Sequence, residues 1–158
     1  MLPILTNPNE KLRKISEPVR GDDILDPTTQ KLIEEMIETL KKEKNGVGLA
    51  APQIGIHKRI ILVETSRGTR VHINPKIISV SESMVESEEG CFSVPNVFGI
   101  VKRHKKIKIK SLDREGKKQQ CTSSGFESII FQHEIDHLDG ILFIDKVIRY
   151  TSSASGTI

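Results

Sequence analysis

The first long pattern of apolar positions follows Asp26 and repeats about every 3.6 residues, as in a helix. Its stripe consists of Leu32, Ile33, Met36, Ile37 and Leu40. Asp26 is a favourable N-cap, and Pro27 suits the first helical position because its missing N–H would have no partner there. Asn45 and Gly46 both tolerate a left-handed backbone. The pattern predicts an amphipathic helix from about Pro27 to Lys44.

After this helix the apolar positions change to the short runs that are typical of strands. RIILVE (59–64) predicts a buried strand, and VHINP (71–75) and KIISVSE (76–82) continue the pattern. The glycine-rich segment GVGLAAPQIG (46–55) and the stretch ESEEGCFSVPNVFG (86–99) are expected to be loops, because small residues and prolines interrupt them.

The segment KKIKIKS (105–111) alternates strictly, with Ile107 and Ile109 on one side and lysines on the other. DREG (113–116) predicts a turn, and KKQQCTSS (117–124) is expected to be the returning strand. A row of lysines also occurs in nucleic-acid-binding proteins. Strict alternation favours a solvated sheet face instead, so we expect no direct readout of nucleic acid.

A second helix is expected from Ser124, a potential cap, to Gly140. Phe126, Ile129, Ile130, His133 and His137 recur at helical spacing and share one broad face, which we expect to point inward. Beyond it, ILFID (141–145) is strand-like. Residues 1–150 are therefore expected to form one domain, and the polar tail 151–158 to be disordered.

Composition is that of an ordinary globular protein: 158 residues, 36% hydrophobic, 28% charged and a net charge of +3. No apolar run is long enough to span a bilayer, and the N-terminus does not resemble a secretory signal. Two cysteines, Cys91 and Cys121, are too few for a disulfide framework. This usage favours a reducing compartment, so we expect a cytoplasmic protein.

The stretch HEIDH (133–137) is the strongest chemical signal. His133 and His137 lie one helical turn apart, where two imidazoles can bind one ion, and Glu134 between them could transfer protons. Two packed core histidines are the alternative, but this spacing with an adjacent glutamate favours a metal site. The third ligand of a zinc protease would lie downstream. The 21 residues after His137 contain neither histidine nor glutamate.

The third ligand is therefore expected upstream, and Cys91 in EGCFSVP is the best candidate. A thiolate with two imidazoles leaves a fourth position open, as in catalytic sites. Cys121 lies in a polar strand and is interpreted as structural. The glycine-rich segment lacks the Lys-Ser/Thr ending of a phosphate-binding loop, which favours a backbone strip that pairs with an extended ligand. Gln53 is either a surface residue or an amide donor near the metal.

Three segments together resemble the signature motifs of peptide deformylase, of the bacterial type: GVGLAAPQ (46–53), EGCFS (89–93) and HEIDH (133–137). The resemblance runs from about Leu5 to Asp145. It implies a compact α+β domain of antiparallel strands wrapped around a central metal-binding helix. It also implies a hydrolase that removes the N-formyl group from the N-terminal methionine of newly synthesised polypeptides.

By this resemblance, Cys91, His133 and His137 hold one divalent ion, Fe²⁺ in the family, with Zn²⁺ or Ni²⁺ as substitutes. Glu134 acts as general base and then acid. The amide of Gln53 and the backbone N–H of Phe92 stabilise the oxyanion. Asp136 either hydrogen-bonds a ligand histidine or lies at the helix surface.

The resemblance implies a methionine pocket formed by Val47, Phe92, Phe126, Ile129 and Ile130. The peptide backbone would run along Val47–Gly48 and near Val97–Gly99. Most relatives have leucine where Phe92 stands, which reshapes the pocket. The chain also ends without the long tail helix of many bacterial relatives, which bears on docking to the ribosome.

Implied partners are N-formylmethionyl nascent peptides and, transiently, the ribosome; we expect a monomer with no membrane contact. An amidase acting on another N-acyl peptide is the alternative enzyme. A metal-stabilised binding module is the non-enzymatic alternative, but it does not explain why both Glu134 and Gln53 are present.

Overall fold

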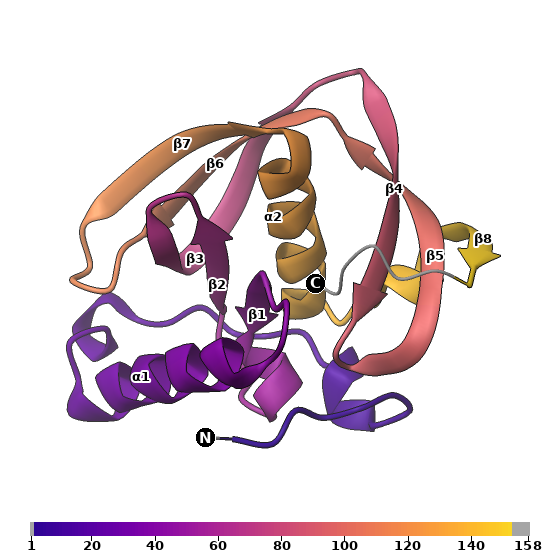
Figure 1. Ribbon diagram of the computed structural model, residues 1–158. Helices are drawn as coiled ribbons and strands as arrows, with labels where there is room; N and C mark the ends of the chain where they lie inside the picture. Colours follow the sequence, from indigo (N-terminus) through magenta and orange to yellow (C-terminus); the bar gives the residue numbers. More distant parts are fainter. Residues whose placement is uncertain (1, 153–158) are drawn as a thin grey trace.

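The computed structural model describes residues 2–152, which form two α-helices, eight strands and four short 3₁₀ helices (Figure 1). The α-helices are α1 (Pro27–Lys42) and α2 (Gly125–Leu138). The strands are β1 (Gly48–Ala50), β2 (Ile60–Thr65), β3 (Gly68–Val80), β4 (Met84–Cys91), β5 (Val94–His104), β6 (Lys106–Leu112), β7 (Lys118–Ser124) and β8 (Val147–Thr151). The 3₁₀ helices are η1 (Glu10–Arg13), η2 (Gly21–Asp23), η3 (Ala51–Ile54) and η4 (Phe143–Asp145).

The strands form a five-stranded sheet in the order β1-β2-β3-β6-β7 and a three-stranded sheet in the order β4-β5-β8. All pairings between these strands are antiparallel. Helix α1 lies against one side of the larger sheet, and α2 stands between the two sheets (Figure 1). The expected α+β domain, with antiparallel strands around a central helix, is confirmed.

Strand β2 is buried on both faces, which explains its uninterrupted apolar run. Ile60 and Leu62 pack in the cluster that contains the α1 residues Ile33 and Met36. Ile61 and Val63 point the other way and pack in a cluster around α2. Alternate side chains of one strand thus connect the two helices through the sheet.

Helix α1 begins as expected, since the Asp26 side chain accepts a hydrogen bond from Thr28 N at 2.8 Å and Pro27 occupies the first turn. It ends at Lys42, two residues before the expected Lys44. Asn45 takes the left-handed conformation with φ of 64°.

Strands β2, β6 and β7 match the expected segments, and β6 alternates with its lysines exposed. The two expected pieces 71–75 and 76–82 form one long strand, β3, which is irregular between Ile73 and Lys76. The irregularity occurs where Asn74 has a φ of 51°.

Four expectations are wrong. The stretch 86–99 is not a loop but the hairpin of β4 and β5, and Gly48–Ala50 in the glycine-rich segment forms strand β1. The ILFID segment contains the 3₁₀ helix Phe143–Asp145 rather than a strand. Ser124 precedes α2, but its side chain makes no capping hydrogen bond.

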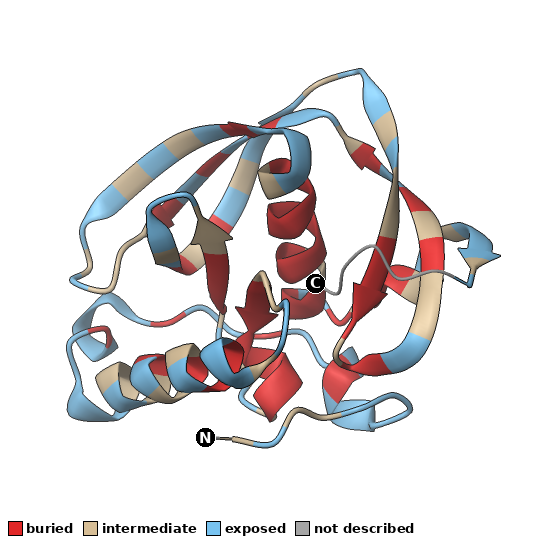
Figure 2. Ribbon diagram, in the orientation of Figure 1, coloured by how far each residue is buried: buried red, intermediate tan, exposed pale blue. Residues whose placement is uncertain are grey.

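Burial of α2 extends almost around its circumference, because strands cover it on two sides (Figure 2). His133, Glu134 and His137 are all buried. Phe126 is the exception among the expected inward residues: it lies in the first turn and is 53% exposed, so that part of the expectation is wrong. No helix within residues 2–152 has the length and apolar character needed to cross a membrane.

The expected tail, 151–158, mostly falls outside the described residues, since only 151 and 152 are described. Thr151 is the last residue of β8.

Helix α2 is terminated by Gly140, which has a φ of 71° and lies against the backbone carbonyl of Arg13. Any Cβ at this position would collide with that backbone, which cannot rotate away. Gly116 is a natural control, with a φ of 82° and only the Ile24 side chain nearby, at 3.8 Å.

We expect Gly116→Ala to lower the free energy of unfolding by about 1–2 kcal/mol, the cost of a left-handed conformation for a residue with a Cβ. Gly140→Ala should cost clearly more, because it also displaces the Arg13 backbone. Urea denaturation of both variants tests this. Equal losses would mean that the close approach of Arg13 does not constrain the end of α2.

Candidate metal centre

Three residues from two elements meet between the sheets. His133 and His137 project from α2, and Cys91 is the last residue of β4. One potential ligand atom from each residue lies within 4.8 Å of the others, and all three residues are buried. Cys91 Sγ is 3.4 Å from His137 Nε2. The structure therefore brings together the three residues that the sequence singled out.

The donor set fits a divalent ion. Ligand atoms about 2.0–2.3 Å from a tetrahedral ion lie roughly 3.3–3.8 Å from one another, which matches the sulfur–nitrogen distance. Nε2 of His133 is buried without any hydrogen-bond partner among the described residues. Burial and the neighbouring Glu134 raise the pKa of the Cys91 thiol to about 12. A cation at this point would satisfy the imidazole nitrogen and stabilise the thiolate.

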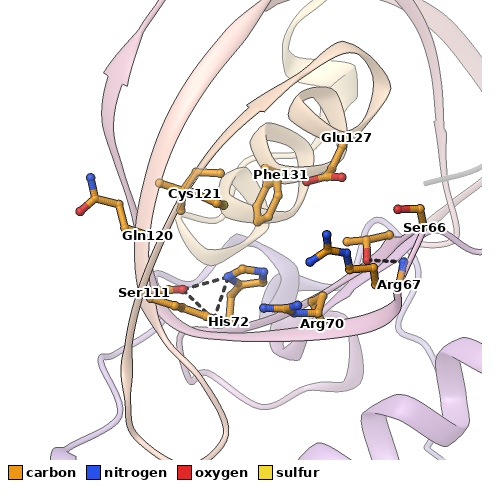
Figure 3. Close-up of a pocket in the computed structure, with 12 residues that line it drawn as sticks. Ser66, Arg67, Arg70, His72, Ser111, Gln120, Cys121, Glu127 and Phe131 are labelled. Carbon is orange, nitrogen blue, oxygen red and sulfur yellow. Dashed lines mark hydrogen bonds between the residues drawn. The ribbon is translucent and has the colours of Figure 1, made fainter.

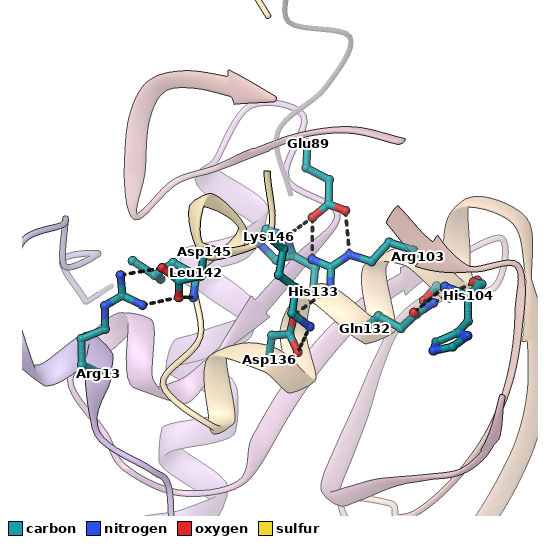
Figure 4. Close-up of polar contacts among 11 residues, drawn as sticks. Arg13, Glu89, Arg103, His104, Gln132, His133, Asp136, Leu142, Asp145 and Lys146 are labelled. Carbon is teal, nitrogen blue, oxygen red and sulfur yellow. Dashed lines mark hydrogen bonds and ion pairs between the residues drawn. The ribbon is translucent and has the colours of Figure 1, made fainter. Parts of the chain in front are cut away.

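The orientation of His133 is set by a buried carboxylate (Figure 4). Nδ1 of His133 is 2.8 Å from Glu89 Oε1, which leaves Nε2 directed at the other two residues. Arg103 binds both oxygens of Glu89 at 2.8 Å, and both side chains are almost fully buried. Burial alone would raise the pKa of Glu89, but hydrogen bonds from Arg103 and His133 outweigh it and lower the pKa to about 2. Glu89 is therefore a carboxylate that holds the histidine in one tautomer.

The Asp136 side chain forms no hydrogen bond with a histidine among residues 2–152, so the first of its two expected roles is wrong. Its carboxylate accepts from Arg103 Nη1 at 2.7 Å and pairs with Lys146 Nζ at 3.0 Å (Figure 4). Asp136 therefore helps to position Arg103, and Arg103 in turn pairs with Glu89.

Gln53 lies beside the thiol, so the alternative of a surface residue is wrong, and its role as an amide donor stays a prediction. It is fully buried, and its Nε2 is 3.6 Å from Cys91 Sγ and 3.2 Å from Ser93 Oγ. Its Oε1 accepts from Ala50 N at 2.9 Å, which fixes the amide so that its nitrogen faces the sulfur.

Glu134 is a fully buried carboxylate, and neither of its oxygens has a partner among the described residues. Burial and then the charge of Glu89 raise its pKa well above the usual range. The carboxylate lies against the backbone of Gly48, where an added Cβ would be 2.5 Å from Oε1. A proton-accepting group thus lies between the three clustered residues and strand β1.

Three residues of the expected methionine pocket share one hydrophobic cluster. Ile129 and Ile130 are buried on α2, and Val47 packs against the same cluster. The Phe92 ring, in the turn between β4 and β5, lies over Gly46, where an added Cβ would be 3.1 Å from its Cζ. Phe126 is exposed one turn before Ile129 and Ile130.

Two backbone segments were expected to pair with a peptide. Strand β1 is at the edge of its sheet, so the side of Gly48–Ala50 away from β2 has no partner strand among residues 2–152. At the second segment, Phe98 and Gly99 of β5 pair with Thr151 and Tyr150 of β8, and Gly99 also pairs with Glu89 of β4. A peptide that runs near Val97–Gly99 stays a prediction.

Glu89 and Arg103 are residues of the centre to which the sequence analysis gave no role. Glu89 opens the EGCFS motif two residues before Cys91, and that position beside an expected ligand is the signal that could have pointed to it. Arg103 stands in the basic run KRHKK and carries no such signal.

Comparisons with known proteins agree with these motifs. The family profile of polypeptide deformylase matches residues 1–153. A curated peptide deformylase of Halothermothrix orenii is 47% identical over 146 residues, which cover 88% of this chain and 94% of that protein.

Solved structures give the same result. A class I type b peptide deformylase from Acinetobacter baumannii with Met-Ala-Ser bound is similar with a TM-score of 0.86 and 36% identity, covering 92% of this chain and 98% of that chain. An actinonin-bound structure of a class I type b peptide deformylase from the same organism has a TM-score of 0.87 and 38% identity, covering 92% and 97%.

The contact between Glu89 and His133 generates a prediction about metal affinity. Glu89→Gln keeps the shape but removes the charge that holds the imidazole and its tautomer, so divalent metal affinity should fall by about 10–100-fold. Competition with a chromogenic chelator measures this. Glu86→Gln, on the same strand but exposed and paired with Arg149, is the control and should bind as wild type. Unchanged affinity in Glu89→Gln would contradict the orienting role.

Proposed function

The chain belongs to the polypeptide deformylase family, and from this premise we propose how its residues perform the reaction. The protein is an enzyme that removes the N-formyl group from the N-terminal methionine of newly synthesised polypeptides, and the alternative N-acyl amidase is not favoured. The observation that carries the proposal is the buried group of Cys91, His133 and His137 with the unpartnered carboxylate of Glu134 beside it.

The family and the Cys–His–His group indicate one bound metal ion. In our proposal Cys91, His133 and His137 are its ligands, and the ion is Fe²⁺, with Zn²⁺ or Ni²⁺ able to replace it. One thiolate and two imidazoles suit all three ions. When bound, such an ion polarises the carbonyl group and lowers the pKa of water at its open position.

Glu134 is proposed as the group that moves protons. Burial and the charge of Glu89 raise its pKa, which makes it a stronger proton acceptor, so the carboxylate can accept a proton from the attacking water and later donate it to the leaving amine. Its complete burial supports this role, because no other side chain among residues 2–152 forms a hydrogen bond with the carboxylate.

Two donors are proposed to stabilise the negative charge that develops on the formyl oxygen. The first is the Gln53 amide, whose orientation is fixed through Ala50 and whose nitrogen lies beside Cys91. The second is the backbone N–H of Phe92, the residue that follows Cys91 in the turn between β4 and β5.

The substrate peptide is proposed to add a strand along the free edge of β1, near Val47 and Gly48. Its methionine side chain would contact the pocket residues Val47, Phe92, Ile129 and Ile130, with Phe126 as an exposed contact one turn away. The Met-Ala-Ser complex of the Acinetobacter relative supports a ligand of this type.

Formylated nascent peptides are the substrates that the family implies. We propose that the enzyme acts as a monomer in the cytoplasm, with transient ribosome contact. Support comes from the substrate, which arises at the ribosome, and from the two free cysteines, which suit a reducing compartment.

A matched pair of peptides tests the activity. Metal-replete protein should hydrolyse formyl-Met-Ala-Ser and leave acetyl-Met-Ala-Ser essentially intact, as measured by release of the free amine. Equal or faster hydrolysis of the acetyl peptide would favour the amidase. No hydrolysis of either peptide would favour a metal-stabilised binding module.

Replacement of the proposed base separates metal binding from catalysis. Glu134→Gln keeps the size but cannot accept a proton, so turnover should fall by ~10²–10⁴-fold while the metal content stays at the wild-type level. Glu127→Gln, on the same helix but away from the centre, is the control. Near-normal turnover by metal-loaded Glu134→Gln would remove Glu134 from the mechanism.

Air sensitivity tests the identity of the metal. The Fe²⁺ form should lose activity in air, because the iron or its thiolate ligand oxidises, whereas the Ni²⁺ form should persist. The half-life of activity in air, measured on anaerobically prepared samples of both forms, decides this. Equal half-lives would contradict inactivation at the metal.

A further inference from the structure

A cavity of about 290 Å³ lies on the side of α2 away from the metal centre (Figure 3). Its walls come from β3, β6, β7, α2 and the turn between β2 and β3. No residue assigned to the metal centre lines it. Phe131, which does, lies two residues before His133 and hence about 200° around the helix. The cavity and the metal centre therefore use opposite faces of one helix.

A buried histidine supplies a polar group to this cavity. His72 is only 5% exposed, and its Nδ1 is 2.8 Å from Ser111 Oγ and 3.2 Å from Gln119 Nε2. We assign the ring proton to Nε2, the tautomer in which Nδ1 accepts from Ser111 Oγ or Gln119 Nε2. Burial and then Arg70 lower the pKa of His72 to about 4, so the ring is neutral near pH 7. Its Nε2–H has no hydrogen-bond partner among the described residues.

A cationic side chain stands next to this donor. Arg70 and His72 are at i and i+2 of β3, so both point to the same face of the sheet. Arg70 is exposed and forms no ion pair with any residue of the described range, and its charge acts on both His72 and Cys121. Two hydrogen-bond donors, one of them charged, are thus available side by side in the lining.

The opposite wall is apolar. Phe131 meets the His72 ring edge-on with centroids 4.8 Å apart, and Ile109 and Cys121 continue this wall. Glu127 is the acidic residue of the lining, and Arg67 is a second basic residue beside Arg70, so the lining has a net single positive charge that suits a ligand with one negative charge.

We propose that this cavity is a second ligand site, which binds a small carboxylate carrying a short apolar chain. The carboxylate binds Arg70 and the Nε2–H of His72, and the chain lies against Phe131 and Ile109. The cavity volume of about 290 Å³ is at the lower end of the range for small-molecule sites, so the ligand must be small. The apolar wall and the single net positive charge of the lining favour this ligand over inorganic phosphate.

Titration of the zinc-loaded, full-length protein with hexanoate, followed by two-dimensional amide NMR, tests the site. Hexanoate should shift resonances of β3 and β7 next to the cavity. Hexanamide, acetate and inorganic phosphate should each bind more weakly, because each lacks either the charge or the chain, or carries too much charge. Arg70→Gln should weaken hexanoate binding by about 10-fold or more, the usual effect of losing a charged hydrogen bond. Arg20→Gln, an exposed arginine outside the cavity, is the control and should bind as wild type.

Three results would overturn the proposal. The first is that hexanoate shifts only resonances around His133, and the second is that Arg70→Gln binds it as tightly as wild type. The third is that phosphate binds as well as hexanoate, which would make the site a general anion site. Turnover of a formyl-Met peptide is measured on the same variants and should be unchanged in Arg70→Gln. Loss of turnover in a folded Arg70→Gln protein would also contradict the proposal, because it would mean that the cavity is part of the active site.

Discussion

The buried pair of Glu89 and Arg103 is the interaction on which the geometry of the centre depends. Two opposite charges are held almost without solvent, and such a pair is favourable only when nearly every oxygen and N–H has a partner. Here His133 also forms a hydrogen bond with the Glu89 carboxylate, and Asp136 accepts a further hydrogen bond from Arg103. The polar groups that make burial tolerable are therefore the same groups that orient the metal-binding histidine.

This arrangement also explains why α2 is covered on both sides. Its histidines need the three-stranded sheet, which contributes Cys91, Glu89 and Arg103, whereas its apolar residues need the larger sheet. Phe143, just beyond the helix, stacks on the His133 ring with centroids 6.2 Å apart and closes the remaining side. The helix is consequently a rigid support, on which each histidine has a single environment.

Much of the molecule can be predicted from local patterns. Helix α1, strand β2 and the β6–β7 pair follow from period and capping, and the HEIDH spacing by itself indicates a metal site. The β4–β5 hairpin was missed because these strands contain Gly90, Pro95 and a left-handed Asn96 with a φ of 62°, which are residues and a conformation untypical of strands. Glu89 and Arg103 are 14 residues apart on the two strands of this hairpin, so their partnership was missed together with the hairpin. Neither residue type is expected to be buried.

The separation of the ligands along the chain has a consequence for synthesis. Cys91 and His137 are 46 residues apart in sequence, and Glu89 and His133 are 44 apart. Closing such a loop has an entropic cost that is recovered only when the packing around α2 forms. A chain still being translated, with α2 inside the ribosome, therefore has Cys91 but neither histidine of the centre in place. The enzyme that processes nascent chains becomes competent only after its own chain has emerged through α2.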